Sequence, residues 1–187
     1  MAYGSEVQAT PTNVTDFWFE SETRAHWFTA SDAFDAALRQ RFAALYERAG
    51  AGKLDDWVKT PRGALSLTLL LDQIPRNIFR NSAHAFLSDE KALLLAKTAI
   101  SLGFDLGLGK DERLFLYLPF QHAEDRAAQD EAVRLIEGLG DEEYTNYAQR
   151  HRDIIRRFGR FPHRNKLLGR TSTCEEIEFL RQPGSSF

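Results

Sequence analysis

Histidines, carboxylates and arginines occur in three separated segments whose spacing could support acid–base chemistry or anion binding. The segments are DQIPRN at residues 72–77, QHAED at residues 121–125 and HRDIIRRFGRFPHRNKLLGR at residues 151–170. Imidazoles and carboxylates are the common general acids and bases of proteins. Arginines held on a turn can bind a carboxylate or phosphate through two parallel hydrogen bonds. These three segments therefore contain the candidate site.

The third segment also concentrates positive charge. Residues 150–170 contain eight Lys or Arg residues and one acid, Asp153, whereas the rest of the chain has a net charge of −10. Crowded like charges repel one another, so they need anionic partners, which are either the protein's own carboxylates or a ligand. On a helix Asp153 can reach Arg150, Arg156 and Arg157, so part of this run is expected to be compensated internally.

In the first segment, Asp72 falls in the last turn of the most apolar predicted helix, where the helix dipole disfavours a negative charge. Arg76 is the nearest candidate partner, and Asn77 follows it. The structural interpretation is a local ion pair that fixes the chain reversal after Pro75. The functional interpretation is that these side chains line a cavity.

The second segment precedes an apolar stripe within residues 128–139. Extending that stripe backward by helical steps places Asp125 and His122 on the core-facing side, three residues apart. They are candidate catalytic residues, with Glu124 as a ligand-binding neighbour. The alternative is that the acids of this segment cap the helix that follows.

His151 is the third catalytic candidate, because it lies in the inward-facing stripe of the helix predicted to begin at Asp141. A single inward histidine can equally be a hydrogen-bonded core residue. Past the helix break at Gly159, the predicted ligand-binding residues are Arg160, His163, Arg164, Asn165 and Arg170.

Helical periodicity accounts for nearly the whole chain and predicts an all-α fold. Capping residues and apolar spacing place about seven to eight helices, which begin near Asn13 or Thr15, Ser31, Thr60, Ser88, Asp111, residue 124, Asp141 and Thr173. Pro75 is expected to stop the third helix, and the fifth is expected to lead into Pro119. Short loops imply a compact array of antiparallel helices.

The overall composition suits one globular domain of residues 13–187 behind a flexible leader of residues 1–12. The chain has 187 residues, 43% hydrophobic residues, a net charge of −3 and a single cysteine, Cys174. The cysteine count excludes an intrachain disulfide and a cysteine-rich metal cage. The chain shows neither a secretory signal nor a membrane span, so we expect a cytoplasmic protein that does not bind membranes.

Several functional classes find little support in the sequence. It contains no glycine-rich phosphate loop, dinucleotide fingerprint or nucleophile elbow, so no cofactor is predicted. The paired histidines of zinc enzymes are absent, and no metal is predicted, although His122, Asp125, His151 and His163 could supply ligands. The acidic remainder of the chain disfavours nucleic-acid binding.

The chain resembles the mainly bacterial family called domain of unknown function 924, over roughly residues 14 to 182. The matching blocks are Phe17-Trp18-Phe19, LLDQIPRNIFR (70–80), Ala85-Phe86 with Asp89, LPFQHAED (118–125), and His151 through IIRRFGRFPHRNKLLGR to Thr173 and Glu176. Ala123 is a departure, since a serine is expected there. The resemblance implies a compact helical fold similar to tetratricopeptide-like arrays, with no established activity, cofactor or catalytic residue.

Three functional hypotheses remain open. The favoured one is a pocket for a small anionic ligand, in an enzyme or a sensor of unknown reaction, which requires the three segments to converge. The alternative is a protein-interaction module that presents the arginine-bearing helix to an acidic protein partner. In the third, the charges only form internal networks that hold helix ends together.

Overall fold

The computed structural model describes residues 10–186, which form helices joined by short loops, with no β-strand among them. The all-α prediction is therefore confirmed. The α-helices are α1 (Pro11–Phe19), α2 (Ser21–Arg24), α3 (Asp32–Gly50), α4 (Pro61–Thr68), α5 (Ile74–Ile78), α6 (Asp89–Ser101), α7 (Lys110–His122), α8 (Arg126–Glu137), α9 (Glu142–Phe158) and α10 (Cys174–Leu180). The other helical turns are η1 (Asp55–Lys59), η2 (Leu69–Gln73), η3 (Ala83–Phe86), η4 (Phe104–Gly107) and η5 (Pro162–Arg164).

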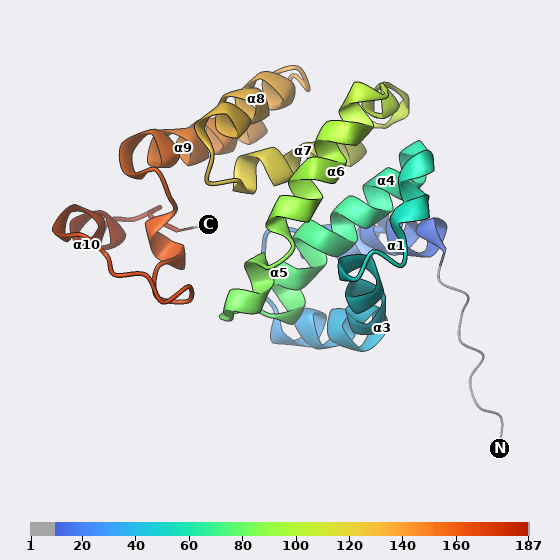
Figure 1. The fold of residues 1–187 in the computed structure, drawn as a ribbon, viewed down its shortest axis with the longest axis horizontal. Helices are drawn as coiled ribbons and strands as arrows, with labels where there is room; N and C mark the ends of the chain where they lie inside the picture. The colour runs from blue at the N-terminus through green and yellow to red at the C-terminus, as the bar shows by residue number, and fades with distance from the viewer. Residues whose placement is uncertain (1–9, 187) are drawn as a thin grey trace.

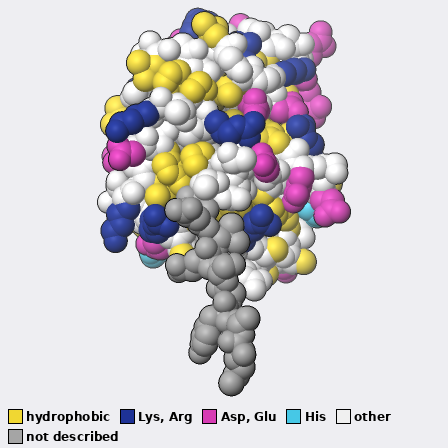
Figure 2. Space-filling model, turned by 90° about the vertical axis from the view of Figure 1, so that its right-hand side faces the viewer, with side chains coloured by type: hydrophobic (Ala, Val, Ile, Leu, Met, Phe, Trp, Pro, Cys, Tyr) yellow, Lys and Arg dark blue, Asp and Glu magenta, His cyan; other side chains and the backbone are white. Residues whose placement is uncertain are grey.

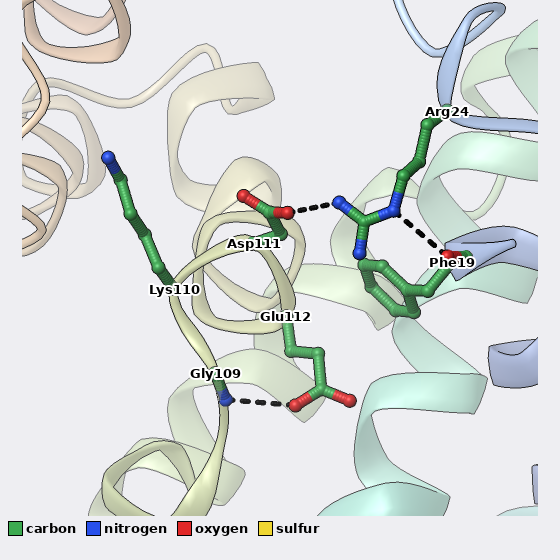
Figure 3. A pocket seen from close by; sticks show the side chains of 6 residues that line it. All are labelled: Phe19, Arg24, Gly109, Lys110, Asp111 and Glu112. Atoms are coloured by element: carbon green, nitrogen blue, oxygen red, sulfur yellow. Dashed lines mark hydrogen bonds and ion pairs between the residues drawn. The ribbon is translucent and has the colours of Figure 1, made fainter. Parts of the chain in front are cut away.

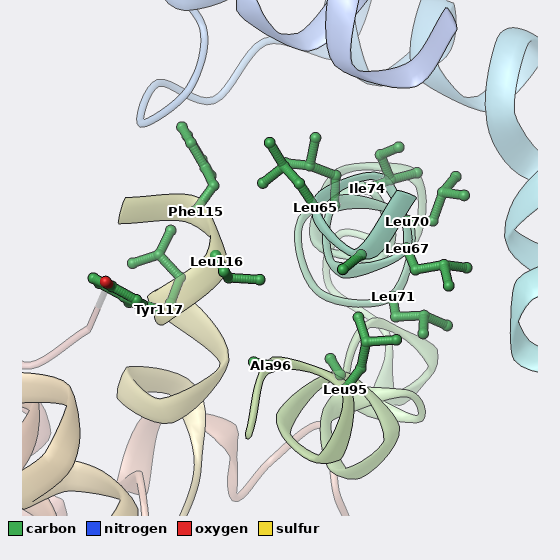
Figure 4. Packing of buried hydrophobic residues seen from close by; sticks show 14 of the residues in the cluster. Leu65, Leu67, Leu70, Leu71, Ile74, Leu95, Ala96, Phe115, Leu116 and Tyr117 are labelled. Atoms are coloured by element: carbon green, nitrogen blue, oxygen red, sulfur yellow. The ribbon is translucent and has the colours of Figure 1, made fainter. Parts of the chain in front are cut away.

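The main hydrophobic core lies where α4, α6 and α7 pack against one another, with α1 against α4 and α3 against α5 (Figures 1 and 4). Leu65, Leu71 and Phe115 are fully buried there. Burying one such side chain contributes roughly 1.5–3 kcal/mol. No helix among residues 10–186 has both the length and the apolar character that crossing a bilayer requires.

A smaller, separate core holds the C-terminal part together. Ile154 and Ile155 of α9 pack with Phe161 and are covered by Phe158 and by Phe179 of α10. Gly159 ends α9 in a left-handed conformation (φ +72°), which glycine adopts without strain, so the predicted break at this residue is confirmed. In Figure 1 this C-terminal part lies beside α5 and the start of α6.

The helix predicted to stop at Pro75 instead continues to Ile78 through the π turn η2. A proline within a helix has no N–H for the carbonyl four residues earlier, here that of Leu71. The hydroxyl of Ser88 donates to this carbonyl at 2.5 Å, and the Ile74 N–H bonds back five residues to Leu69. The π turn and Ser88 thus replace the hydrogen bond that Pro75 removes.

Three further details of the helices differ from or go beyond the sequence-based predictions. Thr10, rather than Asn13 or Thr15, caps α1, so residues 11 and 12 are helical and only residues 1–9 of the predicted leader lie outside the described residues. The short α2 was not predicted. Helix α7 continues through Pro119 to His122, because Leu118 and Phe120 on either side of the proline are both buried in the core.

Candidate functional site

The π turn η2 places Asp72 in the interior, where its carboxylate is fully buried. Three side chains bond to it. The Nδ1 atom of His122 lies 2.8 Å from Oδ1 and 3.0 Å from Oδ2. Gln73 Nε2 donates to Oδ2 at 2.5 Å, and Arg76 Nη2 donates to Oδ1 at 3.1 Å. Burial alone would raise the pKa of Asp72, but the hydrogen-bonded His122 and the charge of Arg76 together hold this pKa below its usual range.

The bond to Asp72 fixes the tautomer of His122. A carboxylate has no hydrogen to donate, so the proton lies on His122 Nδ1 and the neutral ring presents Nε2 as an acceptor. Burial, followed by the charge of Arg76, lowers the pKa of His122 despite the attraction of Asp72. No hydrogen bond from residues 10–186 reaches Nε2, and 14% of the side chain is exposed.

Two arginines share the carboxylate of Asp89, at the first position of α6. Arg76 Nη2 donates to Oδ1 at 3.0 Å and Arg164 Nη1 donates to Oδ2 at 3.2 Å. The guanidinium of Arg164 lies between two aromatic rings, 4.7 Å from the centroid of Phe86 and 4.5 Å from that of Phe161. Burial and the nearby Arg76 lower the pKa of Arg164 to about 10.

His151 lies beside His122, with 6.3 Å between their ring centroids. Its Nδ1 is 2.8 Å from the carbonyl oxygen of Tyr147, one helical turn earlier, so Nδ1 carries the proton here too. Burial lowers the pKa of His151 well below its ordinary value. We call the group Asp72, Arg76, Asp89, His122, His151 and Arg164 the polar cluster.

A bidentate ion pair between Arg170 and Glu124 connects the loop after α9 to the α7–α8 turn. Arg170 donates to both carboxylate oxygens of Glu124, at 2.6 and 2.9 Å, and Glu124 also accepts the backbone N–H of Phe161 at 2.7 Å. The ring of His163 lies 5.6 Å from that of Phe161 in a tilted arrangement, and burial lowers the pKa of His163 to about 4. Glu124, His163 and Arg170 thus border the polar cluster.

The three predicted segments therefore meet, but four of the predicted residues point elsewhere. Asp125 caps α8 by accepting the Ala128 N–H, which is the structural alternative stated above. Asn77 donates to Asp35, and Asn165 donates to Ser172. Arg160 forms a bidentate pair with Glu176, as the distances of 2.6 and 2.8 Å show.

Three more arginines of the basic run, all on α9, have acidic partners within the protein. Arg156 pairs with Asp130 and Arg157 pairs with Glu175. Arg152 lies 3.5 Å from Asp153. This face of α9 therefore carries alternating charges instead of an uncompensated positive field, which weakens the case for an acidic partner protein. On the face of the molecule shown in Figure 2, basic and acidic side chains are likewise interspersed.

The polar cluster is partly accessible to solvent. Its most exposed side chains are those of Arg76, Asp89 and His122, each a fifth exposed or less. A hollow of about 480 Å³ lies instead between α1–α2 and the start of α7, where Arg24 and Asp111 form an ion pair across it (Figure 3). A second hollow of about 380 Å³ lies at the α8–α9 turn. Neither hollow is lined by a residue of the polar cluster.

The sequence reasoning did not assign Phe86 and Asp89 to the site. Both belong to a block that resembles the family, but the sequence gives neither of them a role in the site. No periodic pattern identifies them, because their partners Arg76 and Arg164 are distant in the sequence. Among residues 10–186, no group of three or more His, Cys, Asp or Glu side chains is arranged to hold a metal ion.

Comparison with known proteins decides the family. Residues 14–184 match the family described as bacterial protein of unknown function, DUF924. The chain belongs to the DUF924 family. A solved structure of a protein of unknown function, ATU0120 from Agrobacterium tumefaciens, is 43% identical to this DUF924 protein, with a TM-score of 0.87, and the match covers 91% of this chain and 96% of that one. No curated protein matches the chain.

Proposed function

We propose that the polar cluster binds a small anionic molecule and that His122 Nε2 accepts a hydrogen bond or a proton from it. The observation that carries this proposal is the Asp72–His122 pair. A buried carboxylate that orients a neutral imidazole, with the distal nitrogen left as an acceptor, is the arrangement that general-base catalysis uses.

Arg76 and Arg164 have N–H donors without hydrogen-bond partners in the described part of the chain, which favours a ligand that carries several hydrogen-bond acceptors. A guanidinium has five N–H donors. Arg76 bonds to its carboxylates only through Nη2 and Arg164 only through Nη1, while the buried Nε atoms of both have no hydrogen-bond partner among residues 10–186. A carboxylate or phosphate could accept from such donors in a bidentate manner. A ligand that binds here is expected to shift the Phe86 side chain, since Phe86 lies against both guanidiniums.

Ligand stabilisation against heat tests this proposal. A ligand that binds only the folded state raises the melting temperature, so we would measure melting curves with inorganic phosphate, succinate and AMP as probes. We expect at least one probe to stabilise the wild-type protein and to lose its effect in Arg164→Lys, because lysine cannot reproduce the planar fork. His122→Gln should weaken the same response.

The control variant is Arg160→Lys, which alters an arginine that is paired with Glu176 outside the cluster. It should keep the full ligand response, whatever its effect on the unliganded melting temperature. If no probe stabilises the protein, or if Arg160→Lys and Arg164→Lys lose the response equally, the polar cluster is a structural network and the proposal is wrong.

A further inference from the structure

An exposed apolar ridge runs along the outer face of α6, on the side away from the main core. Leu87, Leu94 and Leu102 are each more than half exposed. In Figure 1, α6 crosses in front of α7. The opposite side of α6 faces the core, where it buries Ala92, Leu95, Ala96 and Ala99. We call Leu87, Glu90, Leu94, Lys97 and Leu102 the α6 ridge.

The α6 ridge is arranged symmetrically about Leu94. Leu87 lies seven residues before Leu94, just ahead of the first residue of α6, and Leu102 lies eight residues after Leu94, at the C-cap of the helix. Glu90 and Lys97 lie four residues before and three residues after Leu94, toward the same edge of the exposed face. Neither Glu90 nor Lys97 forms an ion pair with another residue from 10 to 186.

We propose that the α6 ridge pairs with the α6 ridge of a second copy of this chain, in an antiparallel dimer with its twofold axis near Leu94. A twofold axis perpendicular to the helix reverses its direction but keeps each side chain on the same edge of the contact. It therefore sets Glu90 opposite the partner's Lys97, Leu87 opposite the partner's Leu102, and Leu94 against its own copy. The ridge is thus complementary to itself in both charge and apolar character.

The size of this contact indicates how strong the dimer is. One pair of short antiparallel helices buries less than the ~1,200 Å² of total surface that stable complexes usually exceed. We therefore expect a weak dimer with a micromolar dissociation constant, populated in a concentration-dependent way.

Sedimentation velocity over a wide range of protein concentrations tests the proposal. The wild-type protein should shift from monomer toward dimer as its concentration rises. Leu94→Glu should remain monomeric, because it sets two carboxylates against each other at the axis. The matched control is Ile177→Glu, which alters an exposed aliphatic residue on α10, away from the ridge, and should dimerise as the wild type does.

Charge reversal tests the register of the pairing. Glu90→Lys alone should weaken the dimer by setting like charges opposite each other, and adding Lys97→Glu should restore it. The single and the double variant share the substitution at Glu90, in the first turn of α6, so any cost of that change to the helix itself is common to both and cannot explain a recovery. A dimer that does not respond to these changes would contradict the proposed register.

Cross-linking gives an independent measurement. In a Cys174→Ser background, Leu94→Cys should form disulfide-linked dimers under mild oxidation, whereas Ile177→Cys should not. The natural cysteine is exposed and must be removed first. A wild-type protein that stays monomeric at every concentration, or a dimer that Leu94→Glu leaves intact, would overturn the proposal.

Discussion

Two arginine sites on either side of Phe161 use their hydrogen-bond donors very differently. Arg160 bonds through Nε and Nη2 to both oxygens of Glu176 and adds the Thr171 carbonyl. Arg164, four residues later, makes a single 3.2 Å bond to a carboxylate that it shares with Arg76. The first arrangement is typical of a structural ion pair whose geometry is complete. The second leaves donors unused, and this difference is why we place ligand binding at Arg164.

The largest expected effect is on stability at Asp72. Asp72→Ala removes the acceptor of His122, Gln73 and Arg76 together, and it leaves Arg76 largely buried with only Asp89 as its partner. Breaking a buried pair from one side typically costs ~3–5 kcal/mol. Urea denaturation should show a loss of unfolding free energy in that range. A loss below ~1 kcal/mol would mean that the carboxylate adds little to the fold.

Glu176→Ala tests the contrast between the two arginine sites, because Glu176 is the bidentate partner of Arg160. Glu176 also accepts the Thr173 N–H in the capping box of α10. Losing the cap costs ~1 kcal/mol, and losing bonds to a charged group adds a similar amount, so we expect ~2 kcal/mol in total. The response to anionic probes should not change. If Glu176→Ala abolished that response, the two arginine sites would not be independent.

If Ser88 supplies the hydrogen bond that Pro75 cannot donate to the Leu71 carbonyl, mutations at Ser88 and Pro75 should have coupled effects on stability. Ser88→Ala leaves the buried Leu71 carbonyl without this donor and should cost ~1–2 kcal/mol. Pro75→Ala restores a backbone N–H in that helix, so its effect should be more favourable in the Ser88→Ala background than in the wild type. A double-mutant cycle measures the coupling. Additive effects would contradict the compensation.

As the pH falls from neutral, the protonation of the largely buried histidines should be the first process to lower the free energy of unfolding. Their pKa values are lowered in the folded protein, to about 4 for His163 from an ordinary value of 6.5. The unfolded chain therefore binds more protons in this window, so stability is full above pH ~6.5 and falls as the pH drops toward 4. His163→Gln should flatten this dependence in urea titrations across that range. Equal slopes for the variant and the wild type would contradict the assignment.

Much of the fold could be predicted from local chemistry. Thr60-Pro61, Ser31, Asp141 and the Thr173 capping box begin helices as their residue types predict, and Gly159 ends one. These signals act within a few residues of one another, so they are visible in one sequence. The continuation of the third helix through Pro75 was not predictable in this way, because its compensating donor, Ser88, belongs to the next helix.

The candidate site could be predicted only in part. Asp72 and His122 were predicted because they interrupt apolar patterns, and Arg164 because it lies in an arginine-bearing loop after a helix break; the favoured hypothesis required them to converge. The local pair Arg76–Asp72 was inferred from its spacing, whereas the pairing of Arg156 and Arg157 with Asp153 was wrong. Pairs such as Arg170–Glu124 could not be inferred, because they are set by tertiary packing. The same holds for Asp125, which is favoured equally as a cap and as a site residue until its neighbours are known.

In the proposed site, Asp72 holds His122 in the tautomer whose Nε2 is free to accept a hydrogen bond from a ligand. Nitrogen-15 NMR of the histidine side chains at neutral pH tests it most directly, with His122→Gln used to assign the signals. The account predicts a protonated Nδ1 and an unprotonated Nε2 for His122, and an Nε2 signal that moves when a stabilising anion is added to the wild type but not to Arg164→Lys. A protonated Nε2, or an Nε2 signal unaffected by every anion that stabilises the protein, would contradict the account.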